Sequence, residues 1–169
     1  MIRFSMIRFF GAISALFLMA TAAAAEPTRT ESFAIKGGVD HPHTVTLADL
    51  QHEPPTTVEI SQRTAHGPLA GKFTGVLLWA LLQEAGVTLE GGKKNDLLRH
   101  SVVITASDGY STVLSLGEIA PDFGNAQAIV AYAQDGKPID GANGFARLIV
   151  AGDKAAGRAI SAISTIEVH

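Results

Sequence analysis

Short segments rich in apolar and β-branched residues recur along this chain, and the last of them alternates apolar and polar residues with the two-residue period of β-strands. Segments of this kind cover residues 33–35, 58–60, 127–134, 146–150 and 160–168, and turn residues separate several of them. The sequence therefore predicts a domain that is built mainly from short strands.

The clearest pair of strands surrounds the dipeptide Asp108-Gly109. Residues 101–106 and 111–116 flank this dipeptide with alternating apolar residues, and glycine accepts the positive φ that a tight turn requires. We therefore expect two antiparallel strands that are joined in a hairpin.

Helical periodicity is limited to two places after the N-terminal segment. Residues 73–85 carry apolar residues at positions 73, 76, 77, 80 and 81, which share one helical face, and Gly86 provides a C-terminal stop. A strand over residues 44–47 enters a single helical turn at residues 48–50, which the sequence Glu53-Pro-Pro ends. The expected fold is α+β, with mostly β mixed sheets and few helices.

The N-terminus has the pattern of a secretory signal peptide. Arg3 and Arg8 precede an apolar run at residues 9–20, and small residues follow up to Ala25. The run is shorter than the about 20 apolar residues that a spanning helix needs, which favours cleavage after Ala25 over a retained anchor. We therefore expect residues 1–25 to be a cleaved signal peptide and the protein to be periplasmic or secreted.

Composition removes several function classes. The chain has 13 Lys and Arg against 16 Asp and Glu residues, a formal net charge of −3, and no basic cluster that would follow a phosphate backbone. We therefore expect no nucleic-acid partner. The chain has no cysteine, and it lacks hydrolase motifs such as Gly-x-Ser-x-Gly and His-Glu-x-x-His.

Three segments are informative through their order and spacing. They are residues 73–82, which begin Phe-Thr-Gly-Val, residues 107–110, Ser-Asp-Gly-Tyr, and residues 144–168, which contain Gly-Phe-Ala-Arg-Leu-Ile-Val. Together they resemble the core domain of sulfite-oxidase-type molybdopterin-dependent oxidoreductases, over most of residues 33–168. The resemblance implies the sulfite-oxidase molybdopterin-domain fold for residues 33–169 and molybdopterin as the cofactor.

The resemblance also implies where a site would lie. Enzymes of this type hold molybdenum through one cysteine, about a dozen residues before Gly75, and counting back reaches Arg63. A guanidinium only donates hydrogen bonds, so Arg63 cannot replace a thiolate ligand. Arg63 is then either an exposed residue at a strand end or an arginine that binds an anion. His66, in the following loop, is a pocket candidate or an ordinary exposed histidine.

Four further residues are candidates for the site, and two of them, Tyr110 and Arg147, match site positions of the family. Tyr110 corresponds to a tyrosine beside the metal and is the candidate catalytic residue, unless it only begins a strand. Arg147, Lys154 and Arg158 are candidates for binding an anionic cofactor, and for Lys154 and Arg158 the alternative is a pair of solvated loop charges. We expect any pocket to lie between residues 63–68, Tyr110 and Arg147.

Three functions remain open. The first is an exported molybdopterin-dependent-oxidoreductase-like domain, in which the missing cysteine leaves catalysis in question. The second is a non-enzymatic module on the same fold that binds a small anion or contacts a membrane-bound redox or sensor partner. The third is a metal-binding protein that uses His41, His43 and His52, because imidazole is a common ligand of zinc and copper.

Overall fold

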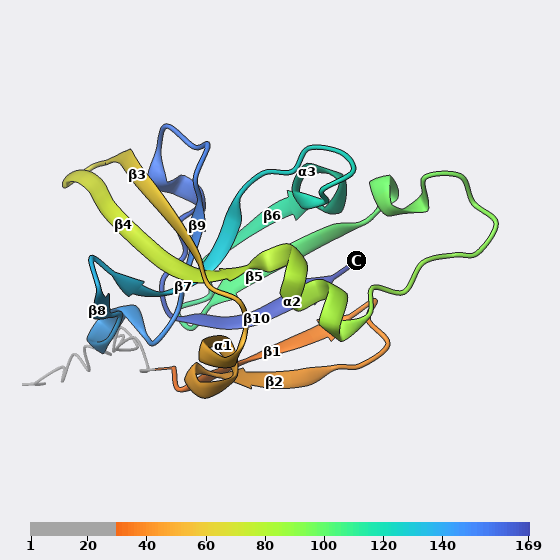
Figure 1. Cartoon of the computed structure of the whole chain (residues 1–169), viewed down its shortest axis with the longest axis horizontal. Coiled ribbons are helices and arrows are strands. Elements are labelled where there is room, and N and C mark those ends of the chain that lie inside the picture. Colours follow the sequence, from red (N-terminus) through yellow and green to blue (C-terminus); the bar gives the residue numbers. More distant parts are fainter. Residues whose placement is uncertain (1–29) are drawn as a thin grey trace, which may run out of the picture.

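The computed structural model describes residues 30–169, and the expected signal peptide, residues 1–25, lies outside them. Two β-sheets form the framework of this part (Figure 1). The first sheet has the strand order β2 (His43–Thr46), β1 (Ser32–Gly37), β10 (Ile163–Val168), β5 (Ser101–Ala106) and β6 (Ser111–Ser115). The second has the order β3 (Thr56–Thr64), β4 (Gly67–Leu77), β7 (Ala128–Gln134) and β8 (Lys137–Pro138), and β9 (Arg147–Val150) also pairs with β7.

The strands pair mostly in antiparallel fashion, and one of these pairs was predicted from the sequence. Strands β1 and β10 run parallel and the other named pairs are antiparallel. The predicted hairpin is confirmed, because β5 pairs with β6 from Ser101 with Ser115 to Thr105 with Ser111. In its turn, Gly109 has a φ of 88° and the carboxylate of Asp108 accepts the Tyr110 amide at 2.9 Å.

The helices are short. They are α1 (Leu47–His52), α2 (Leu78–Ala85) and α3 (Leu116–Ile119), with 3₁₀ turns η1 (Asp96–Arg99), η2 (Gly141–Asn143) and η3 (Ala156–Arg158). The predicted turn after β2 is confirmed as α1, which begins with a capping box between Thr46 and Asp49 and ends before Pro54-Pro55. Across residues 30–169, the helices are all too short or too polar to cross a membrane.

The helix predicted over residues 73–85 is correct only in its second half. Residues 73–77 belong to β4, which pairs with β3 on one side and β7 on the other, and α2 begins at Leu78. The pattern was ambiguous because Phe73 and Val76 are buried, as a helical face requires, yet they face different clusters of the folded protein. Gly86 ends the helix as predicted, with a left-handed φ of 71°.

The core lies between the two sheets and continues past β7. The larger apolar cluster includes Phe33 and Phe145, whose rings stack with centroids 5.8 Å apart. Along β7 the side chains alternate between the two clusters: Val130 belongs to the larger one and Ile129 to the smaller. Because β7 is buried on both faces, it reads in the sequence as a continuous apolar run.

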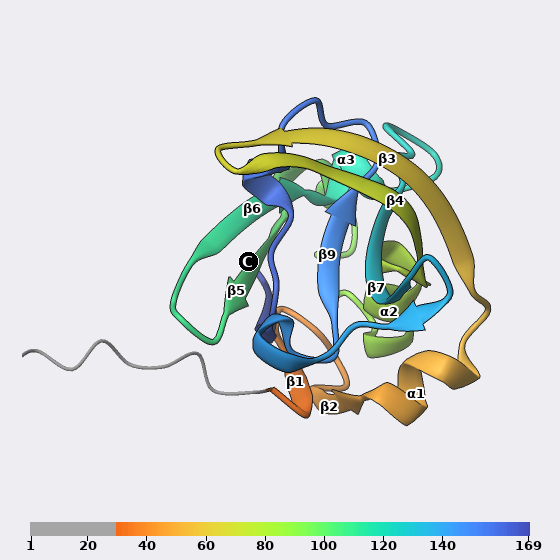
Figure 2. The ribbon, with the colours of Figure 1, turned by 90° about the vertical axis from the view of Figure 1, so that its left-hand side faces the viewer.

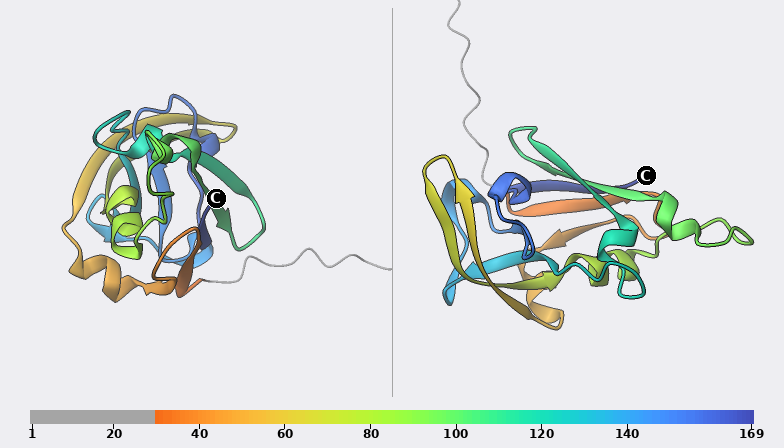
Figure 3. Two further views of the ribbon diagram at one scale, coloured as in Figure 1. Left: turned by 90° about the vertical axis from the view of Figure 1, so that its right-hand side faces the viewer. Right: turned by 90° about the horizontal axis from the view of Figure 1, so that it is seen from above.

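The β3–β4 hairpin and the connection after α2 mark the two ends of the molecule. The hairpin curves around one end, where it passes close to the connection between β9 and β10 (Figure 2). Residues 86–100 extend from the opposite end, as the view from above shows (Figure 3). The end of the β3–β4 hairpin, which carries Arg63 and His66, therefore lies beside the connection that carries Lys154 and Arg158.

Candidate functional site

The connection between β9 and β10 lies beside two of the predicted site residues. The Arg63 amide, near the end of β3, donates to the Lys154 carbonyl at 3.0 Å. The Tyr110 hydroxyl, from the β5–β6 turn, donates to the Gly157 carbonyl at 2.7 Å. These contacts fix the path of the connection across the end of both sheets.

The side chains at these positions mostly face solvent. Tyr110 is 55% exposed, and Arg63, His66 and Lys154 are exposed as well. Within residues 30–169, no side-chain hydrogen bond or ion pair is made by Arg63, His66 or Lys154. The structure therefore brings Tyr110 and the backbone of Arg63 to the same connection, without joining their side chains in one pocket.

Gln62, to which no motif in the sequence pointed, occupies the inward position at this end of β3. It is 1% exposed, and its Nε2 donates to the Val150 carbonyl at 2.7 Å. Its Oε1 is buried without a hydrogen-bond partner. The two-residue alternation of β3, in which Ile60 is buried, turns Gln62 inward and Arg63 outward.

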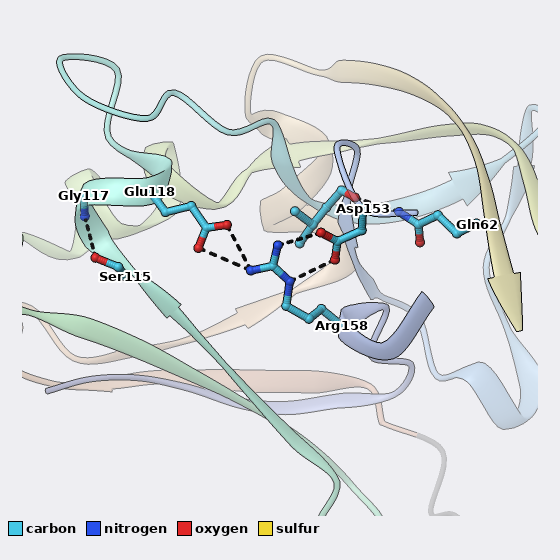
Figure 4. Close-up of polar contacts among 7 residues, drawn as sticks. Gln62, Ser115, Gly117, Glu118, Asp153 and Arg158 are labelled. Atoms are coloured by element: carbon cyan, nitrogen blue, oxygen red, sulfur yellow. Dashed lines mark hydrogen bonds and ion pairs between the residues drawn. The ribbon is translucent and has the colours of Figure 1, made fainter. Parts of the chain in front are cut away.

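Arg158 forms the centre of an ionic cluster (Figure 4). Its Nε and Nη2 donate to the two carboxylate oxygens of Asp153 at 2.9 and 2.6 Å, and its Nη1 lies 3.0 and 3.3 Å from the two of Glu118. The hydrogen bonds that Arg158 donates to Asp153, followed by those to Glu118, raise the pKa of Arg158 above its usual range. Arg158 is therefore a fully paired cation.

A cavity of about 360 Å³ lies beside this cluster. Glu118, Asp153 and Arg158 line it together with Gln127 and the turn after β9, from Val150 to Gly152. Glu118 and Asp153 were not singled out by the sequence, because each reads alone as an ordinary surface or turn carboxylate. Only the fold brings Glu118 to Arg158 across 40 positions of the chain.

Arg147 has a different environment. Its guanidinium is half-buried and donates to the Ser161 hydroxyl, from Nε at 2.9 Å and from Nη2 at 2.6 Å, and to Asn143 Oδ1 at 2.8 Å. Burial lowers the pKa of Arg147. No carboxylate within residues 30–169 lies in ion-pair distance of it.

Arg147 also lines a second cavity, of about 330 Å³, at the start of β9. Lys137 and Asn143 contribute to its walls, as do the carboxylates of Asp135 and Asp140. Asp135 Oδ1 accepts the Lys72 amide at 2.9 Å, which engages that carboxylate in the adjoining turn. Two cationic side chains, Lys137 and Arg147, therefore line the cavity. The hydrogen-bond partners of Arg147 are all neutral.

The three N-terminal histidines lie at another part of the molecule. His43 and His52 line a cavity of about 240 Å³ with Asp49, Glu53 and Glu84. Nδ1 of His43 lies 2.8 Å from the His41 carbonyl oxygen. In the part of the chain that the structure describes, no group of three or more His, Asp or Glu residues is arranged to hold a metal ion. The arrangement thus gives a histidine-based metal site no support.

Comparisons with known proteins agree with the resemblance in the sequence. The family model described as the oxidoreductase molybdopterin binding domain matches residues 21–169. No curated protein sequence matches the chain. The sulfane dehydrogenase SoxCD from Paracoccus pantotrophus has a similar structure, with a TM-score of 0.65 and 19% identity over 82% of this chain. This chain covers 38% of that one, and the likeness confirms the predicted α+β fold.

Proposed function

Because the chain belongs to the oxidoreductase molybdopterin-binding domain family, we propose that it is an exported, non-catalytic member that binds small anions at Arg147. The signal-peptide pattern of residues 1–25 supports export. The absence of cysteine from the whole chain supports a role without the molybdenum–thiolate chemistry that the resemblance implies.

The described residues do not fit a molybdenum centre of the expected kind. The inward position at the end of β3 is Gln62, a neutral carboxamide whose Nε2 already bonds to the Val150 carbonyl. A metal that requires a soft, charged sulfur ligand finds none there. Arg158, which an anionic cofactor would use, is paired with two carboxylates. The described residues therefore support no reaction on this cofactor.

The environment of Arg147 is the main support for anion binding. A charge removed from water is costly unless an opposite charge compensates for it, and a half-buried Arg147 has only a hydroxyl and an amide as partners. Its Nη1 has no acceptor among the described residues and is free to donate to an anion. Lys137 lies on the wall of the same cavity, but Asp135 and Asp140 line it too, so the support for anion binding is the free Nη1 donor of Arg147 and not the net charge of the cavity.

We expect calorimetric titration with inorganic sulfate, at constant ionic strength, to show one site on the protein. Arg147→Gln should weaken binding about tenfold or more, since hydrogen bonds to charged groups contribute about 1.5–3 kcal/mol. Lys137→Gln should weaken it less, because that side chain is exposed on β8. The control is Arg99→Gln, an exposed arginine on η1. Equal affinity in the protein and in Arg147→Gln would contradict the proposal.

A membrane-bound redox or sensor partner remains a prediction from the sequence. The anion site and such a partner are compatible, because a domain that binds a small anion can report its presence to another protein. The single observation that favours anion binding over interaction alone is the uncompensated guanidinium of Arg147.

A further inference from the structure

In the cluster of Arg158, Glu118 and Asp153, the two carboxylates block the guanidinium from binding a ligand. All three nitrogens of the guanidinium donate to carboxylate oxygens, at distances between 2.6 and 3.3 Å. Arg158 is 32% exposed, Glu118 35% and Asp153 19%, so the three lie at the edge of the cavity and not in the core. A phosphate oxygen that approached Arg158 would have to displace a carboxylate.

Hydrogen bonds of the backbone in and after α3 hold Glu118 in place. The Ser115 hydroxyl accepts the Gly117 amide at 3.2 Å at the start of α3, and the Glu118 carbonyl accepts the Ala126 amide at 2.9 Å. Gly124 lies directly against the Glu118 backbone, where a side chain would overlap the Glu118 carbonyl oxygen. The loop after α3 therefore folds onto the helix and aims Glu118 at Arg158.

Asp153 reaches Arg158 within the same connection. It meets two guanidinium nitrogens side by side, which is the strongest geometry for an arginine–carboxylate pair. Two carboxylates against one guanidinium leave the cluster with an excess of one negative charge. The cavity beside it therefore repels anions, although it contains an arginine.

We infer that Glu118 and Asp153 determine the specificity of this cavity: by occupying Arg158 they exclude phosphate and phosphorylated molecules from it. This inference goes beyond the proposed anion site, because it concerns a second arginine in a separate cavity.

The test asks whether a variant gains phosphate binding at Arg158. In the variant Glu118→Gln/Asp153→Asn, Arg158 keeps neutral hydrogen-bond partners, and the cluster of the three side chains carries a net positive charge. Inorganic phosphate is titrated at constant ionic strength, and the ¹⁵N NMR signals of the arginine Nε–H groups are followed, with Arg158 assigned from its loss in Arg158→Gln. We expect the Arg158 signal to respond in the double variant with at least about tenfold higher affinity than in the unmodified protein.

Two controls isolate the local effect. Glu59→Gln/Asp122→Asn removes the same charge from exposed positions and should leave the Arg158 signal insensitive to phosphate. Adding Arg158→Gln to the double variant should abolish the gain. If the double variant does not fold, Glu118→Gln alone keeps the Asp153 pair and should give a smaller gain.

The outcomes separate the two proposals. Equal affinity of Arg158 for phosphate in the unmodified protein and in the double variant, or no response of Arg158 in the folded variants, overturns the role of Glu118 and Asp153. The Arg147 signal reports the proposed anion site in the same titration, and its failure to respond would overturn only that proposal.

Discussion

Replacing Gly75 with alanine is expected to destabilise the domain by about 3 kcal/mol or more. A Cβ at Gly75 would overlap the Val130 carbonyl oxygen and the Ala131 Cα, both in the backbone of β7. Because neither backbone can move without breaking the β4–β7 ladder, the two strands would separate locally. Denaturant unfolding, followed by circular dichroism, measures the change in the free energy of unfolding.

The sign of this effect distinguishes the strand from the predicted helix. In a helix over residues 73–85, Gly75→Ala would stabilise the protein by about 1 kcal/mol. The control is Gly91→Ala, since Gly91 lies in open space and its φ is ordinary, so the change should stay within about 0.5 kcal/mol. A stabilised Gly75→Ala variant would contradict the pairing of β4 with β7.

Replacing Gln62 with glutamate is expected to cost about 3 kcal/mol or more of unfolding free energy at pH 7. The change removes the amide that donates to Val150 and places a carboxylate at a position that is 1% exposed. Burial raises the pKa of the introduced carboxyl in the folded protein above its ordinary value of about 4.3. The penalty is therefore complete above this raised pKa and decreases as the pH falls through it, and the part that is due to ionisation is absent below about pH 4.3.

The comparison for this variant is Gln62→Leu, which removes both the amide donor and the unpartnered Oε1. It should cost about 1 kcal/mol, because an apolar side chain of similar size fills the same space and the Val150 carbonyl still accepts the Asp153 amide at 3.2 Å. Denaturant unfolding at pH 7 and pH 4 measures both. A Gln62→Glu variant as stable as Gln62→Leu at pH 7 would show that this end of β3 is open to water.

The sequence predicted the strands well because their signal is local. The alternation around Asp108-Gly109 and the apolar run of β7 are local patterns, and all three strands, β5, β6 and β7, formed where expected. The N-terminal half of the predicted helix was wrong because Phe73 and Val76 fit a helical face and a strand equally well. The long-range pairing with β7 decided between them, and a local pattern does not contain that information.

The candidate site was less predictable, since it depends on contacts between distant segments. Counting back from Gly75 reached Arg63, whereas continuing the alternation from Val58 and Ile60 would have led to the inward Gln62. The sequence singled out Arg147 and Arg158 through the resemblance alone. It could not show that Glu118 neutralises one of them while the other keeps neutral partners, because those partners come from the folded chain.

The central claim is that this family member acts without a molybdenum centre. Its most direct test is elemental analysis of the protein, purified from the cells that produce it, together with mass spectrometry for released pterin. We predict neither stoichiometric molybdenum nor pterin, because the chain has no cysteine and Gln62 occupies the inward end of β3. One molybdenum with one pterin per chain would contradict the account.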